Sequence, residues 1–236
     1  MPDVALVTGA AGALGAQVAR TLSLRGHKVA LVDSKAASAR LDELASSLGQ
    51  ACVVAGDLAS ETTWREAVTR AERELGAAPS LAALVAGAWR GGRALHEEST
   101  DDAWQTLMTA NVETVYRGLR ALLPSMVASR RGSVVVVGSR AAVEPWTSAG
   151  AAGYAASKSA VVALAQAAAA EVRAFGVRVN AILPSTLDTP ANRAAMPNAD
   201  ATQWVTLESA AGVVAFLLSD EARDVEGAAL PVYGRA

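Results

Sequence analysis

A tyrosine and a lysine stand four residues apart in the segment YAASK, which runs from Tyr154 to Lys158. In a helix this spacing places both side chains on one face. A free tyrosine has a pKa near ~10, too high for easy proton exchange at neutral pH. A neighbouring ammonium is expected to lower that pKa by roughly 1–3 units, so that the phenol can give a proton to a carbonyl or take one from an alcohol. An isolated pair of this kind is more often an ordinary surface feature, so its meaning depends on the rest of the chain.

A glycine-rich loop near the N-terminus has the composition of a phosphate-binding turn. It reads TGAAGALG from Thr8 to Gly15 and lies between a short apolar run and an alanine-rich stretch. Such a loop lets the backbone approach a pyrophosphate and points the N–H groups of the following helix at it. The residues expected to contact the pyrophosphate are Gly9, Gly12, Ala13, Leu14 and Gly15.

Acidic residues follow the next two apolar runs. Asp33 ends the run ALVD, where a carboxylate accepts hydrogen bonds from both hydroxyls of an adenosine ribose. The same charge repels a 2′-phosphate, so NAD(H) is favoured over NADP(H). Asp57 and Leu58 follow the third run and are placed to contact an adenine. The plainer alternatives are a solvated turn for Asp33 and a helix cap for Asp57.

Short apolar runs alternate with longer alanine-rich stretches along the whole chain. Continuous apolar strands alternating with helices indicate a parallel sheet covered on both faces. No linker or repeat divides the chain, so we expect residues 1–236 to form one doubly wound α/β domain. The predicted strands are Val4–Val7, Lys28–Val32, Cys52–Ala55, Leu81–Ala86, Ser133–Val137, Val177–Leu183 and Ala228–Val232. The predicted helices are Ala13–Leu24, Ala36–Leu48, Ser60–Leu75, Thr100–Ala128, Tyr154–Phe175 and Leu207–Leu218.

The composition argues against several classes of function. A net charge of −2 and a pI of about 5.8 give no electrostatic footprint for nucleic acid or anionic lipid. Cys52 is the single cysteine, and His27 and His96 are the two histidines, so neither a disulfide nor a metal site is expected.

The alanine content explains the positive mean hydropathy. The chain has 55 alanines, almost half of its hydrophobic residues, and alanine favours helices without implying a membrane. The longest uncharged apolar stretch, Ser159–Ala170, is shorter than a bilayer span. The start of the chain, MPDVALVTGA, does not read as a signal peptide. We therefore expect a cytoplasmic protein without a membrane partner.

Several motifs occur together in one order, and through them the chain resembles the short-chain dehydrogenases/reductases from end to end. The matching segments are TGAAGALG, Asp33, Asp57-Leu58, TANV around Asn111, Ser139 after SVVVVG, YAASK, and VNAILPSTLDT. The resemblance implies a Rossmann-type fold with a seven-stranded sheet, a nicotinamide cofactor, and a catalytic tetrad of Asn111, Ser139, Tyr154 and Lys158. It extends the expected cofactor contacts to Gly87, Tyr154, Lys158, Pro184, Thr186 and Thr189.

The resemblance also implies a role for each member of the tetrad. Ser139 would orient a substrate carbonyl, at the carboxyl edge of the sheet where α/β proteins form their sites. Lys158 would hold the nicotinamide ribose. Asn111 would bind backbone or a water that leads to Lys158.

Three positions depart from the family pattern. Ala13 stands where the loop usually has its middle glycine, Val85-Ala86-Gly87 replaces Asn-Ala-Gly, and Pro184-Ser185 replaces Pro-Gly. The spacing from Ser139 to Tyr154 also exceeds the commonest spacing of the family, so the intervening loop is modified.

The segment Leu183–Pro197 is similar to quinonoid dihydropteridine reductases, NADH enzymes of the same superfamily. Those relatives keep the tyrosine and lysine but lack the catalytic serine, so Ser139 points back towards carbonyl or alcohol chemistry. Trp89, Trp146 and Trp204 either line a substrate cavity or serve in packing.

We therefore expect an NAD(H)-dependent oxidoreductase that acts on a carbonyl or alcohol of a small or medium-sized substrate, with Tyr154 as proton donor or acceptor. A dihydropteridine reductase-like activity and a non-catalytic nucleotide-binding regulator are the alternatives. The helices Thr100–Ala128 and Tyr154–Phe175 form subunit interfaces in the resembling family, so we expect a homodimer or homotetramer. The short segment after Pro190 predicts a small substrate lid.

Overall fold

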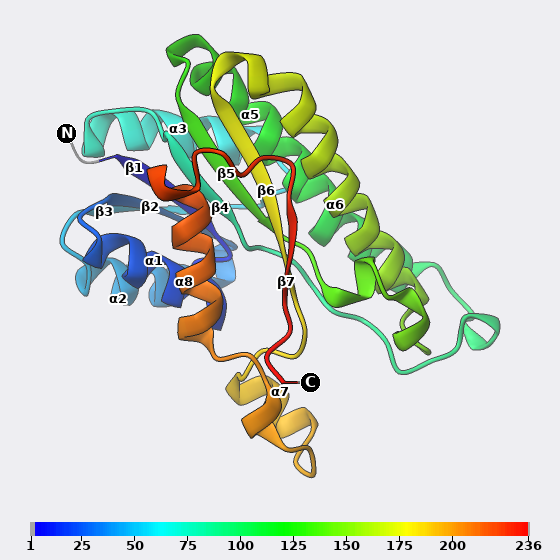
Figure 1. Ribbon diagram of the computed structural model, residues 1–236. Helices are drawn as coiled ribbons and strands as arrows, with labels where there is room; N and C mark the ends of the chain where they lie inside the picture. Colours follow the sequence, from blue (N-terminus) through cyan, green and yellow to red (C-terminus); the bar gives the residue numbers. More distant parts are fainter. Residues whose placement is uncertain (1–2, 236) are drawn as a thin grey trace.

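A seven-stranded parallel sheet forms the centre of the computed structural model, which describes residues 3–235 (Figure 1). The strand order is β3-β2-β1-β4-β5-β6-β7, and every neighbouring pair is parallel. The strands are β1 (Val4–Thr8), β2 (Lys28–Asp33), β3 (Ala51–Ala55), β4 (Leu81–Leu84), β5 (Gly132–Val137), β6 (Val177–Pro184) and β7 (Ala229–Val232).

Helices cover both faces of the sheet. They are α1 (Ala13–Leu24), α2 (Ser38–Ser46), α3 (Glu61–Leu75), α4 (Asp102–Leu107), α5 (Thr114–Ser129), α6 (Ala152–Val172), α7 (Pro190–Ala195) and α8 (Leu207–Leu218). In Figure 1, α1, α2 and α8 lie on one side of the sheet, and α3, α5 and α6 lie on the other. The predicted doubly wound parallel sheet is confirmed.

Strand β1 explains why the apolar runs have no polar alternation. All five of its residues are buried. Val4 and Leu6 pack into the core beneath α3 and α5, whereas Ala5 and Val7 pack into the core beneath α1 and α8. A strand with a helix layer on each side needs apolar side chains at every position.

The order of the strands creates a crevice at one edge of the sheet. The chain winds outward from β1 to β3 and then returns to place β4 on the other side of β1. In open α/β sheets, ligands bind outside the carboxyl ends of the strands at such a switch point. The carboxyl ends face the lower edge of the molecule in Figure 1, beside α7 and the C-terminus.

Some predicted boundaries differ from the structure. The predicted helix Thr100–Ala128 is divided into α4 and α5 by a π-helical turn, Met108–Glu113. Strand β4 ends at Leu84, two residues before the end of its apolar run. Helix α7 and the short helical turn Ala201–Gln203 occupy the predicted lid segment. Among residues 3–235, no helix combines the length and apolar character that a membrane crossing requires.

Candidate active site

The glycine-rich loop joins β1 to α1 in a conformation that requires two of its glycines. Gly9 has a positive φ of +62°, and a Cβ atom on Gly15 would lie 2.1 Å from the Gly9 carbonyl oxygen. The Gly12 N–H donates to that same carbonyl over 2.9 Å. Ala13 is exposed on the outside of the loop, so this departure from the family pattern creates no steric conflict.

The first turn of α1 can accept an anion. Gly12 caps the helix without a side chain, and the first turn has no acidic residue. The first N–H groups of a helix have no partner within it, and they carry its positive dipole end. Leu14 is buried in the core below the loop. The loop therefore fits a pyrophosphate, because its glycines leave space that side chains would otherwise fill.

Asp33 lies at the carboxyl end of β2 and contacts the loop directly. One carboxylate oxygen accepts the Ala11 N–H over 2.9 Å, and the other accepts the Ser34 N–H over 2.7 Å. A carboxylate oxygen has two acceptor sites, so both oxygens keep capacity for ribose hydroxyls. The sequence did not indicate that Asp33 also fixes the position of the glycine-rich loop.

Asp57 and Leu58 follow β3 at the same edge. The Asp57 carboxylate accepts the Ala59 N–H over 2.9 Å, which is a local turn contact. The Leu58 carbonyl accepts the indole N–H of the buried Trp64 over 2.8 Å. Ser60, and not Asp57, occupies the N-cap position of α3, without a side-chain bond to the helix backbone.

Thr8 binds the backbone after β4, where Val85 stands in place of the family's asparagine. Its hydroxyl oxygen accepts the N–H groups of Val85 and Ala86 over 3.0 and 3.2 Å. These contacts join the carboxyl ends of β1 and β4. A Cβ on Gly9 would lie 2.9 Å from Ala86 Cα, so the two loops are in close contact as well.

Asn111 lies in the π-helical turn and is 1% exposed. Its amide oxygen accepts the Ala88 N–H over 2.7 Å, and its amide nitrogen donates to the Ala88 carbonyl over 3.0 Å. The same nitrogen donates to the Ser157 hydroxyl over 2.9 Å. Asn111 thus binds backbone, as the resemblance implies. The buried Ser157, which the prediction missed, links it to α6.

Gly87 brings Asn111 and Lys158 together. A Cβ at this position would lie 2.7 Å from the Asn111 amide oxygen and 3.3 Å from Lys158 Nζ. Any side chain at residue 87 would therefore displace one of these groups. Lys158 is 5% exposed and donates to the Val137 carbonyl over 2.8 Å. Burial lowers the Lys158 pKa from 10.5 to about 8.

Ser139 and Tyr154 face each other across the end of β5 and the first turn of α6. The Ser139 hydroxyl lies near the Tyr154 phenol, and Lys158 Nζ lies 6.0 Å from the centre of the Tyr154 ring. Burial raises the Tyr154 pKa above its ordinary value, while the nearby Ser139 hydroxyl lowers it. The expectation that the Tyr154 pKa lies below its ordinary value is wrong for the protein alone, because desolvation dominates.

The segment after β6 completes the edge of the sheet. The Ser185 hydroxyl donates to the Tyr233 carbonyl over 2.7 Å, so the serine that replaces the family's glycine anchors the C-terminal tail. The Thr186 carbonyl accepts the Val205 N–H over 2.9 Å, and the Thr189 hydroxyl caps α7 through Asn192. Pro184 is the last residue of β6.

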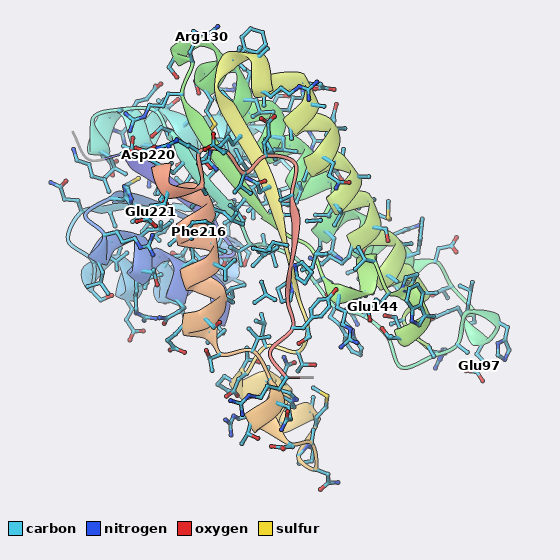
Figure 2. The ribbon with its side chains drawn as sticks, viewed as in Figure 1. Glu97, Arg130, Glu144, Phe216, Asp220 and Glu221 are labelled. Atoms are coloured by element: carbon cyan, nitrogen blue, oxygen red, sulfur yellow. The ribbon has the colours of Figure 1, made fainter. Side chains whose placement is uncertain are left out.

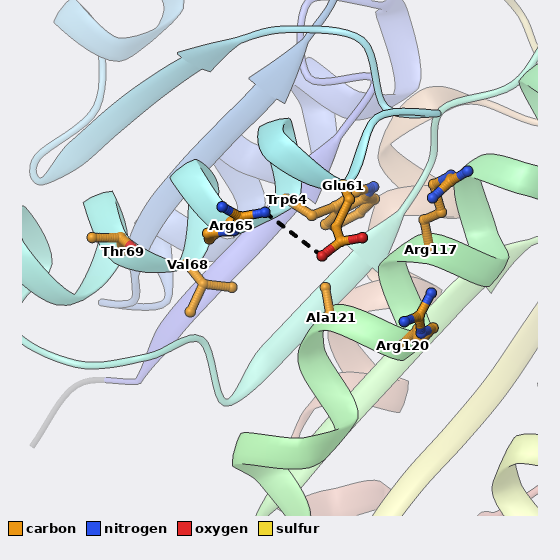
Figure 3. A pocket seen from close by; sticks show the side chains of 8 residues that line it. All are labelled: Glu61, Trp64, Arg65, Val68, Thr69, Arg117, Arg120 and Ala121. Carbon is orange, nitrogen blue, oxygen red and sulfur yellow. Dashed lines mark ion pairs between the residues drawn. The ribbon is translucent and has the colours of Figure 1, made fainter.

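The three tryptophans divide into two groups. Trp204 is 9% exposed and serves in packing, whereas Trp89 and Trp146 are 63% and 76% exposed beside the loops that follow β4 and β5. A separate surface cavity of about 280 Å³ opens between α3 and α5, with Trp64 in its wall and Arg117 and Arg120 at one side (Figure 3). It contains none of the residues predicted for catalysis.

Known proteins resemble this chain over nearly its whole length. A family model described as short chain dehydrogenase matches residues 3–200. A 2,5-dichloro-2,5-cyclohexadiene-1,4-diol dehydrogenase from Sphingobium indicum is 30% identical over 241 residues, which cover 98% of this chain and 94% of that protein. A galactitol 2-dehydrogenase (L-tagatose-forming) from Cereibacter sphaeroides is 37% identical over 187 residues, covering 78% of this chain and 71% of that protein. The crystal structure of a 3-oxoacyl-[acyl-carrier protein] reductase with bound NAD from Brucella melitensis superposes with a TM-score of 0.84 at 28% identity, covering 98% of this chain and 90% of the other.

Proposed function

The chain belongs to the short-chain dehydrogenase family and is an oxidoreductase, and from this premise we propose that it uses NAD(H) to interconvert a carbonyl group and an alcohol. The observation that carries the proposal is the convergence of Ser139, Tyr154 and Lys158 at the carboxyl ends of β4 and β5. Each polar group there is buried or partly buried, and each has a partner in the same cluster or in the adjacent backbone.

The site fits a nicotinamide dinucleotide along the crevice at the switch point. The loop from Gly9 to Gly15, with Ala13 and Leu14, would hold the pyrophosphate. Asp33 would hold the adenosine ribose, and Asp57 and Leu58 would border the adenine. Towards the reacting centre, the remaining contacts would come from Gly87, Tyr154, Lys158, Pro184, Thr186 and Thr189. A bound NADH supplies the hydride.

The protein's own part in the reaction is to hold the substrate and to move one proton. In the direction of reduction, the Tyr154 hydroxyl gives its proton to the substrate oxygen as that oxygen gains charge. In the direction of oxidation, the tyrosinate oxygen takes the proton from the alcohol. The Ser139 hydroxyl binds the same substrate oxygen and orients it.

Lys158 supplies the positive charge of the site. With a pKa of about 8 it is mostly protonated at neutral pH. A charge in a site from which water is excluded acts more strongly than the same charge in water, so Lys158 stabilises the tyrosinate that forms during reduction. Asn111 binds the backbone at Ala88 and the Ser157 hydroxyl. These bonds hold the segment after β4 in place against α6.

The proposal is tested by NADH oxidation, followed by the loss of its absorbance, with ketones, aldehydes, quinones and a quinonoid dihydropterin as substrates. At least one ketone, aldehyde or quinone is expected to be reduced. Turnover of the dihydropterin alone would favour the dihydropteridine reductase-like alternative. Tight NADH binding without turnover of any member of the panel would favour a nucleotide-binding regulator.

The variant Tyr154→Phe isolates the proton step. It is expected to lower kcat by about 10²–10⁴-fold, the usual contribution of a general acid, while the Kd for NADH stays within about two-fold. The matched control is Tyr116→Phe, on the exposed face of α5, which should leave both values unchanged. Full turnover by Tyr154→Phe would contradict the assignment.

A further inference from the structure

Three side chains, Arg140, Glu144 and Tyr233, lie together beside Ser139. The Arg140 guanidinium lies over the Tyr233 ring, 4.9 Å from its centre, and donates through Nε to the Glu144 carboxylate over 2.7 Å. The same carboxylate lies near the Tyr233 phenol and raises its pKa. We call Arg140, Glu144 and Tyr233 the tail clamp, because it fastens the C-terminal tail to the turn that carries Ser139.

The tail clamp is partly shielded from solvent. The side chains of Arg140 and Glu144 are 33% and 25% exposed, and Tyr233 is partly buried. Burial, together with the nearby Glu144 carboxylate, raises the Tyr233 pKa above its ordinary value. The phenol therefore stays protonated and able to donate throughout the neutral range. Figure 2 labels Glu144 at the lower end of the sheet, beside the first turns of α6.

One side of the tail clamp is the turn that positions Ser139. The Ser139 hydroxyl accepts the Ala141 N–H over 3.2 Å, and the Ser159 hydroxyl of α6 donates to the Ala142 carbonyl over 3.0 Å. The turn ends where the Glu144 N–H donates to the Arg140 carbonyl. Glu144 lies in the lengthened loop between Ser139 and Tyr154, so that extra length has a structural role here.

The other side is the end of β6 and the lid segment. The Tyr233 carbonyl accepts the Ser185 hydroxyl over 2.7 Å, directly after Pro184. Two residues further along, the Arg235 N–H donates to the Gln203 carbonyl over 2.9 Å. Tyr233 thus reaches the Pro184–Ser185 turn through its backbone and the Ser139 turn through its side chain.

We propose that Tyr233 is a positioning residue for the reaction, acting through Arg140 and Glu144 to fix the Ser139 turn relative to the nicotinamide side of the site. The expected effect of Tyr233 on catalysis rests on the proposed function, whereas its effect on the Ser139 turn does not. Its physical basis is that an error of about 1 Å in the placement of a reacting group costs up to about 10²-fold in rate. Ser139 acts on the substrate through its hydroxyl alone. Its contribution to the rate therefore depends on the position of the turn that carries it.

The first test needs no substrate. Amide hydrogen exchange is compared in Tyr233→Leu, which removes the ring and the phenol, and in Tyr233→Phe, which keeps the ring. Exchange in the peptide covering residues 140–144 should rise about ten-fold or more in Tyr233→Leu and much less in Tyr233→Phe, with α8 unchanged. The control is Arg235→Ala, an exposed side chain of the same tail. Unchanged exchange in residues 140–144, or an equal rise across the whole fold, would overturn the proposal.

The second test uses a substrate found by the NADH oxidation assay. Tyr233→Leu should lower kcat by about 10- to 100-fold, whereas the Kd for NADH stays within about two-fold and Tyr233→Phe recovers most of the loss. Glu144→Ala should have a similar effect, and the double variant should be no worse than either single one, because both open the same cluster. Additive losses would contradict a shared clamp. A protein that turns over no substrate would refute the proposed function, while the exchange experiment would still decide the tail clamp.

Discussion

The hydroxyl of Ser139 lies beside the phenol of Tyr154 and lowers its pKa, against the effect of burial. Burial alone would hold the tyrosine far from ionisation, and the Ser139 hydroxyl works in the opposite direction by stabilising the tyrosinate oxygen. Ser139 therefore has two effects in the proposed reaction. It orients the substrate oxygen, and it brings the proton donor closer to its working range.

Removing the Ser139 hydroxyl should distinguish the two kinds of substrate. Ser139→Ala is expected to lower kcat/KM for a ketone or aldehyde by about 10²–10³-fold, the usual cost of losing one donor to a developing oxyanion. The pterin reaction of the alternative proposal would not use this serine and should be nearly unaffected. Steady-state kinetics with both substrates measure the difference, and Ser46→Ala on the exposed end of α2 is the control. An equal loss for both substrates would show that Ser139 serves the fold rather than carbonyl chemistry.

The choice of cofactor is expected to depend on Asp33. Asp33→Ala removes a charge-assisted contact with the adenosine ribose, a contact worth about 1.5–3 kcal/mol. The KM for NADH should rise by about 10- to 100-fold, and the preference for NADH over NADPH should weaken because the repulsion of a 2′-phosphate is lost. Asp42→Ala, on the exposed face of α2, changes the net charge equally and should leave the preference intact. If the preference for NADH over NADPH is the same in Asp33→Ala as in the parent protein, Asp33 does not bind the adenosine ribose.

Burial of Lys158 predicts a stability that depends on pH. Its pKa is about 8 in the folded protein against 10.5 ordinarily, so the unfolded chain binds more protons between these values. The free energy of unfolding contributed by this residue therefore rises as pH increases from about 8 to 10.5 and is constant below that window. Between pH 8 and pH 10.5, this contribution to the free energy of unfolding changes by an amount on the order of 3 kcal/mol.

The variant Lys158→Met should separate stability from activity. It removes the cost of the buried charge but also the bond to the Val137 carbonyl, so a stabilisation on the order of 1–2 kcal/mol at pH 7 is expected, together with a Tm higher by several degrees. Turnover should be lost. Calorimetry across pH 7–10.5 measures the effect, with Lys35→Met on the surface as the control. A less stable Lys158→Met protein with an unchanged pH profile would refute this account of the lysine.

Self-association is expected through α5 and α6. Tyr116 is 50% exposed on the outer face of α5, next to Arg117, which borders the cavity of Figure 3. Light scattering should give a mass of two or four times the 24.0 kDa chain. Tyr116→Asp should reduce that mass, and Leu24→Asp at the end of α1, on the opposite side of the sheet, should not. A monomer at micromolar concentration would disprove the expectation.

The sequence predicts the sheet and most of the site because these depend on local patterns. Strands such as β1 are recognisable because both of their faces are buried, and Gly15 is predictable because its backbone must pass close to Gly9. The family motifs then indicate the residues that gather at the carboxyl edge. Ala13 and Ser185 fit the structure without a glycine, since one is exposed and the other gains a partner in the tail.

Other features depend on contacts between distant residues and leave no local signal. The apolar run of β4 continues through Val85 and Ala86, but the Thr8 hydroxyl takes their N–H groups and the strand ends at Leu84. The π-helical turn coincides with the contacts of Asn111 to Ala88, far away in the chain. The sign of the Tyr154 pKa shift depends on burial, which a spacing of four residues cannot reveal.

Thr8 has a mechanical consequence. Its hydroxyl binds the N–H groups of Val85 and Ala86, and at the next residue, Gly87, a side chain would collide with Asn111 and crowd Lys158. The loop that would receive the pyrophosphate and the groups that would handle the proton are therefore joined through three consecutive residues, 85–87. We expect a displacement of the loop at Gly9 to move this segment as well, so that cofactor binding at one end of the crevice would affect the alignment of the proton-handling groups at the other.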